Sequence, residues 1–102
     1  MKRSELDPII HAPNRLQICA ILSPMEEAEF RVIREELNVS DSVLSKHVSQ
    51  LVEAGYVKIR KSTINSRQRT WAALTARGRK AFANHLKALQ AIVDRATPNG
   101  SV

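Results

Sequence analysis

Two short amphipathic segments separated by only three residues constrain the fold of this chain more than any other feature. Residues 30–37 (FRVIREEL) place apolar side chains at the spacing of one helix face. Residues 41–54 form a second helical pattern, with Ser40 suited to cap its start and Gly55 suited to end it. The intervening residues 38–40 leave room only for a tight turn. The pattern therefore predicts a helix-turn-helix.

The second of these helices has an unusual polar face, made of small hydroxyl-bearing side chains. A step of 100° per residue separates an apolar half from a polar half. The apolar half holds Val43, Leu44, Val48, Leu51 and Val52. The polar half holds Ser42, Ser45, Lys46, Ser49 and Gln50. Small hydroxyls let a helix enter a major groove closely and bond to base edges or phosphates, although an ordinary helix pair with a wet face would read the same way.

His47 lies between the two halves of this helix. An imidazole there either donates to a DNA phosphate or packs at the margin of the core, and the sequence leaves both interpretations open.

Two alternating segments after the second helix predict a β-hairpin. In residues 56–61 (YVKIRK) and 69–74 (RTWAAL) the side chains alternate between two faces, and a polar loop, STINSRQ, separates them. A helix-turn-helix followed by a hairpin is the winged-helix arrangement. Four cations of the wing (about 60–69) are placed to reach phosphates or the minor groove, or else are solvated hairpin charges. They are Arg60, Lys61, Arg67 and Arg69.

The charge of the chain is divided unevenly along its length. Residues 1–53 hold six Lys/Arg against nine Asp/Glu, whereas residues 54–93 hold nine Lys/Arg and no acid, within an overall net charge of +6. A surface kept positive only for solubility would mix both signs. The asymmetry favours a polyanion-binding surface.

Three stretches together resemble the small, stand-alone winged-helix transcriptional regulators of prokaryotes, related to the MarR and ArsR repressors. They are LDPIIHAPNRLQICAIL, VSDSVLSKHVSQLVEAGYVKIRK and RTWAALTARGRKAF, and the likeness covers about Leu6 to Leu89. The resemblance implies a homodimer that binds double-stranded DNA through a recognition helix at about 41–54. It does not specify a small-molecule effector, because members differ in what they sense. It places Ser42, Ser45, Lys46 and Ser49 on the recognition helix and Arg67 and Arg69 in the wing.

The last predicted helix, about 75–96, carries an apolar stripe that suggests dimerisation. Its apolar positions recur every seven residues, and the stripe continues beyond what one small domain needs to cover. Either two copies pack along it across a two-fold axis, or it folds back on the first helix of the same chain, as its early part is expected to do. The residues expected at the seam are Phe82, Leu86, Leu89 and Val93.

These patterns predict one winged-helix domain over residues 1–97 and a disordered tail over 98–102. The fold class is mainly α with a small β-hairpin, and the first helix begins at Pro13 and ends near Leu22. The chain has no apolar run of signal-peptide or membrane-spanning kind, so we expect a cytoplasmic protein.

No enzyme, cofactor or metal site is expected. The chain has no glycine-rich phosphate loop and no zinc-type ligand spacing, and Cys19, its one cysteine, reads as a small core residue. Trp71 is expected to pack on the outer face of the hairpin, with stacking on a base or ligand as the alternative. A winged helix used as a protein-interaction module is the alternative to a DNA-binding regulator.

Overall fold

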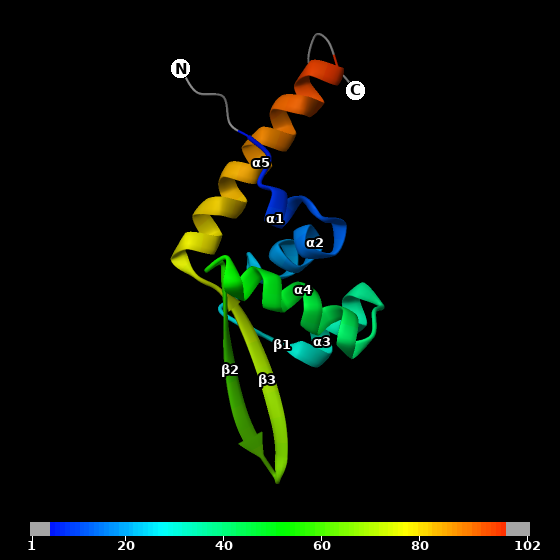
Figure 1. Ribbon diagram of the computed structural model, residues 1–102, viewed down its shortest axis with the longest axis vertical. Helices are drawn as coiled ribbons and strands as arrows, with labels where there is room; N and C mark the ends of the chain where they lie inside the picture. The colour runs from blue at the N-terminus through cyan, green and yellow to red at the C-terminus, as the bar shows by residue number, and fades with distance from the viewer. Residues whose placement is uncertain (1–4, 98–102) are drawn as a thin grey trace.

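The computed structural model describes residues 5–97 and contains five helices and three strands in that range. The predicted tail over 98–102 lies outside the described residues. A helical domain occupies the middle of the molecule, the β-hairpin extends from one end and the last helix from the other (Figure 1). In chain order the elements are α1 (Pro8–His11), α2 (Pro13–Leu22), β1 (Ala28–Glu29), α3 (Phe30–Leu37), α4 (Asp41–Glu53), β2 (Val57–Ile64), β3 (Arg67–Leu74) and α5 (Ala76–Ala96).

The helix-turn-helix predicted from the sequence is confirmed in α3 and α4. Asn38 ends α3 in the left-handed conformation, at φ 54°, which an asparagine adopts more easily than most residues. The Ser40 hydroxyl then accepts a hydrogen bond of 3.2 Å from the Val43 amide and caps α4. Gly55 follows α4 at φ 81°, where a side chain would be strained. Caps at both ends therefore fix the length of the recognition helix.

The sheet differs from the expectation in two ways. It has three antiparallel strands in the order β1, β3, β2. Strand β1 was not predicted, because it has only two residues, which pair with Ala72 and Trp71. The segment expected to be a polar loop belongs mostly to the strands, because β2 and β3 pair as far as Ile64 with Arg67. The turn consists of Asn65 and Ser66, both with positive φ, as the tight two-residue hairpin turns require.

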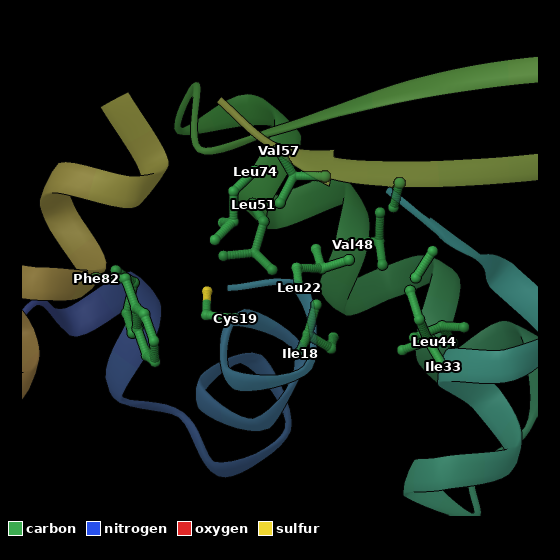
Figure 2. Packing of buried hydrophobic residues seen from close by; sticks show 13 residues of the cluster. Ile18, Cys19, Leu22, Ile33, Leu44, Val48, Leu51, Val57, Leu74 and Phe82 are labelled. Carbon is green, nitrogen blue, oxygen red and sulfur yellow. The ribbon is translucent and has the colours of Figure 1, made fainter. Parts of the chain in front are cut away.

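One hydrophobic core joins the helices to the base of the sheet (Figure 2). Ile18, Cys19 and Leu22 of α2 face the apolar side of α4, and Val57 and Leu74 close the core from the hairpin. Burial raises the pKa of the Cys19 thiol to about 11, which keeps it protonated and supports its prediction as a core residue.

The first half of α5 belongs to this core. Thr75 caps the helix by accepting from the Gly78 amide at 2.9 Å, and a side chain on Gly78 would collide with the Tyr56 carbonyl oxygen at 2.0 Å. Phe82 is 6% exposed and packs in the core of its own chain, which is the fold-back expected for the early part of this helix, so the stripe left for a partner starts beyond Phe82. The second half of α5 projects away from the domain (Figure 1).

Candidate nucleic-acid interface

The outward side of α4 carries the serine-rich face predicted from the sequence. Leu44, Val48 and Leu51 are buried and anchor the helix to the domain. The four polar residues expected to face DNA are all exposed to solvent. They are Ser42, Ser45, Lys46 and Ser49. Two valines expected on the apolar half, Val43 and Val52, are 37% and 41% exposed and lie on the flanks of the helix.

A groove runs between α4 and the hairpin. Ser45, Ser49 and Val52 line it from the helix, and Ile59, Lys61 and Thr70 line it from the strands. Sequence reasoning missed three of these residues as parts of the site: Val52, Ile59 and Thr70. Their signal was weak because an apolar residue in a strand or helix is usually read as core, and only the angle between α4 and the hairpin turns these side chains toward an open groove.

The four wing cations divide between the two faces of the hairpin. Side chains of paired residues in antiparallel strands project to the same face, and the register pairs Lys61 with Thr70 and Arg60 with Trp71. Lys61 therefore lies on the face toward α4, whereas Arg60 lies on the opposite face. Arg67 sits beside the turn and is exposed, and the described residues contain no ion-pair partner for it.

Two acids of the missed strand region hold the cations of the opposite face. The Arg60 guanidinium donates two hydrogen bonds to the Glu27 carboxylate, at 3.1 and 2.5 Å, and lies 5.1 Å from the centre of the Trp71 ring. The hydrogen bond from Arg60 lowers the pKa of Glu27. Arg69 lies 3.8 Å from the Glu29 carboxylate. Trp71 thus packs on the outer face of the hairpin, as expected, with Arg60 over its ring. Its indole N–H is buried and has no hydrogen-bond partner among residues 5–97.

His47 lies on the flank of α4 that faces α2, away from the hairpin. Its Nδ1 is 3.2 Å from a guanidinium nitrogen of Arg15, and its Nε2 is 3.5 Å from the Asn14 amide nitrogen. Partial burial, with Arg15 and Lys46 nearby, lowers the pKa of His47. Of the two interpretations left open by the sequence, the margin of the core describes this position.

The distal half of α5 exposes large apolar side chains. Leu86, Ile92 and Val93 are 46%, 46% and 48% exposed, and Leu89 is half-buried. Monomeric proteins expose single apolar residues routinely, whereas these three lie along one projecting helix.

Other kinds of site find no support in the described part of the chain. Residues 5–97 contain no cluster of three or more His, Cys, Asp or Glu side chains that could hold a metal ion. None of the helices described is long and apolar enough to cross a membrane.

A helix-turn-helix, a β-hairpin wing and an exposed recognition-helix face define the chain as a winged-helix domain. Residues 14–93 match the model of the family described as winged helix DNA-binding domain. The chain belongs to this family, as its resemblance to winged-helix regulators predicts. The family binds DNA and is not one of enzymes.

Three known proteins are similar to this chain. An uncharacterized protein of Methanocaldococcus jannaschii is 37% identical over 78 residues, which cover 76% of this chain and 85% of the relative. A transcriptional regulator homologue from Pyrococcus horikoshii OT3 is 31% identical with a TM-score of 0.82, over 88% of this chain and 89% of that one. HlyU from Vibrio cholerae is 22% identical with a TM-score of 0.64, over 85% of each chain, and shows a shared fold.

Proposed function

We propose that the protein is a cytoplasmic, sequence-specific transcription regulator that binds operator DNA as a homodimer. The observation that carries the proposal is the exposed arc of hydroxyls and one lysine on α4, Ser42, Ser45, Lys46 and Ser49, beside a wing that presents Lys61 on the same side. Hydroxyl and ammonium groups can bond to base edges and to phosphates, and small side chains leave room for a close approach to the major groove.

In this proposal the wing contacts the flanking backbone or minor groove with only part of its positive charge. Lys61 lines the groove beside α4, and Arg67 is exposed at the turn, so both are available to phosphates. Arg60 and Arg69 are paired with Glu27 and Glu29. We assign these two arginines to holding the wing against β1 and not to direct contact with DNA.

The second copy in the homodimer packs against the distal half of α5. Leu86 and Val93 lie seven residues apart, so the exposed stripe continues along one side of the projecting helix. A two-fold axis along this stripe would present two recognition helices to one side of a duplex. Successive major grooves on that side are about 34–36 Å apart, so the operator should be an inverted repeat with half-site centres about 10–10.5 base pairs apart, or a multiple of that spacing.

The test has two steps. First, the protein is titrated against random-sequence duplex DNA at low and high salt, where salt-sensitive binding is expected from phosphate contacts. Next, bound duplexes are selected from a random pool and sequenced, and the proposal expects an inverted repeat. Absence of any binding at low salt would instead support a winged helix that serves as a protein-interaction module.

A further inference from the structure

Arg15 of α2 contacts α4. The groups that face its guanidinium there and in α1 are uncharged: a backbone carbonyl, a side-chain amide and an imidazole. Its Nε donates to the Ile9 carbonyl oxygen of α1 at 2.5 Å. Its Nη1 donates to the Gln50 side-chain oxygen and lies 3.2 Å from Nδ1 of His47, both on α4. No acidic partner of Arg15 is found in residues 5–97. One guanidinium therefore joins α1 and α2 to two positions on one flank of α4.

These contacts oppose rotation of α4 about its own axis, which apolar burial alone resists less well than directional hydrogen bonds do. Leu44, Val48 and Leu51 hold α4 on the domain, but burial of apolar surface is non-directional and leaves small rotations about the helix axis cheap. Side-chain tips lie about 5–6 Å from the axis, so a rotation of about 15° moves them by about 1.5 Å. Such a shift would break hydrogen bonds to base edges, which tolerate only a few tenths of an ångström.

The opposite flank of α4 carries the residues that a rotation would displace. Ser45 and Ser49 line the groove beside the hairpin, whereas His47 and Gln50 face α2. Hydrogen bonds from Arg15 to His47 and Gln50, on the side of α4 that faces α2, consequently determine the direction of Ser45 and Ser49 on the side that faces the hairpin.

We propose that Arg15 is a positioning residue for DNA sequence recognition, which fixes the rotation of α4 through its hydrogen bonds to His47 and Gln50. The inference rests on the proposed function, because it requires α4 to read bases. It assigns a role in selectivity to a residue outside both the helix-turn-helix and the wing.

The state of His47 fits this role. A guanidinium carries only donors, so a hydrogen bond between Arg15 and His47 requires that Nδ1 accepts and that the imidazole is neutral. Protonation would place a second N–H and a second positive charge opposite Arg15. The lowered pKa of His47, caused by burial and then by Arg15 and Lys46, keeps the ring in the accepting form near neutral pH.

The decisive experiment compares selection from a random duplex pool by the wild type, Arg15→Lys and Arg15→Met. Lys87→Met, on the exposed surface of α5, is the control for loss of one positive charge. We expect both Arg15 variants to lose about tenfold of the wild-type preference for the selected sites over random DNA. Arg15→Lys should keep the wild-type salt dependence, and Lys87→Met should keep the preference.

Failure of the inference and failure of the proposed function are distinguishable. If the wild type selects no sequence, the proposed function fails. If the wild type selects a site and Arg15→Lys selects the same site with equal preference, the role assigned to Arg15 is overturned. An equal loss on selected and random DNA, with a reduced salt dependence in Arg15→Met, would make Arg15 a phosphate contact and would overturn it as well.

Two further measurements separate positioning from a general effect on folding. In Arg15→Met, the pKa of His47 followed by NMR should rise from its wild-type value, because the neighbouring charge is gone. Gln50→Ala removes one of the same hydrogen bonds at a half-exposed site and should shift the selected sequences in the same way. Additive losses in the Arg15→Met and Gln50→Ala double variant would show that the two residues act separately, against the inference.

Discussion

The two ends of the molecule expose surfaces of opposite character. The hairpin and the distal half of α5 extend in opposite directions from the helical domain (Figure 1). On the side of the hairpin, it and α4 present hydroxyls, Lys46, Lys61 and Arg67, whereas the distal half of α5 presents Leu86 and Val93. Both surfaces are outside the core, so neither is needed to hold the domain together. A charged surface suits a phosphate backbone, and an apolar stripe suits a second protein surface, so the comparison indicates two different partners.

At each end, some of the residues that the sequence assigned to the partner surface make contacts within the chain instead. On the hairpin, two cations are paired with acids, Arg60 with Glu27 and Arg69 with Glu29. On α5, the apolar residue nearest the domain, Phe82, is covered by the core of the same chain. Fewer residues are therefore available to a partner at each end than the four wing cations and four seam residues expected from the sequence.

The largest expected effect comes from charging the apolar end. Leu86→Asp with Val93→Asp places like charges on the proposed seam at two positions about half exposed in the monomer, so the domain should remain folded. Sedimentation should show a monomer. Affinity for the selected operator should fall by about a thousandfold or more, towards that for random DNA, since specific binding typically exceeds non-specific binding by at least that factor.

Asn84→Asp with Ala91→Asp is the matched control for this prediction. These exposed residues have the same seven-residue spacing and acquire the same charge, but they lie on the other side of α5. The control should remain dimeric and keep its operator affinity. A dimeric Leu86/Val93 variant, or a wild type that is monomeric at micromolar concentration yet selective, would contradict the proposed interface.

Much of this contrast could be predicted from the sequence, because local patterns encode it. Helix periodicity and the Ser40 cap predicted α4, and strand alternation predicted the hairpin. The ion pairs behind the wing could not be predicted, since Glu27 and Arg60 are 33 residues apart and meet only through β1, a strand of two residues. The point at which α5 leaves the core, between buried Phe82 and exposed Leu86, could not be predicted either, because both residues belong to one apolar stripe and only the tertiary contacts distinguish them.

A smaller effect is expected at the recognition helix. Replacing Ser45 or Lys46 with alanine should change which bases are preferred, at a cost of roughly 1–3 kcal/mol confined to a few positions, if their side chains reach base edges. Binding to a panel of singly substituted operators measures this directly. Asp41→Ala is the control from the same helix: Asp41 is paired with Arg34 at 2.8 Å, so its replacement should leave the base preference unchanged. A uniform loss across all operators would assign Ser45 and Lys46 to the DNA backbone instead.

The wing should show a weaker effect that depends on whether a cation is paired with an acid. Lys61→Gln and Arg67→Gln should each lower the slope of log K against log salt by about 0.9, the value for one lost phosphate contact. Arg60→Gln removes the same charge from the residue next to Lys61 but on the face held by Glu27, so its slope should stay close to that of the wild type. Salt titrations on random duplex DNA give these slopes. Equal slopes for the Lys61 and Arg60 variants would mean that the two faces of the hairpin do not differ toward DNA.

The smallest effect is expected at His85, which lies between the two ends of the molecule. Its titration should change the thermal stability of the protein and not the DNA sequence that it selects. His85 is fully buried; its Nδ1 accepts from the Asp7 amide at 2.9 Å, and its Nε2 lies 3.4 Å from Nδ1 of His11. Burial and His11 lower its pKa below the ordinary value of 6.5, so the unfolded chain binds a proton more readily than the folded one.

The stabilising effect of neutral His85 should therefore be complete above about pH 6.5 and should be lost as the pH falls through its folded-state pKa. We expect the Tm to drop by a few degrees, on the order of the effect of 1 kcal/mol, between pH 7.5 and 5.5. In His85→Asn the side-chain oxygen can still accept from Asp7 but cannot titrate, so this variant should show a smaller drop over the same range, whatever its absolute Tm. If the Tm of His85→Asn falls as much as that of the wild type, the pH dependence of stability comes from other groups, His47 among them, and not from His85.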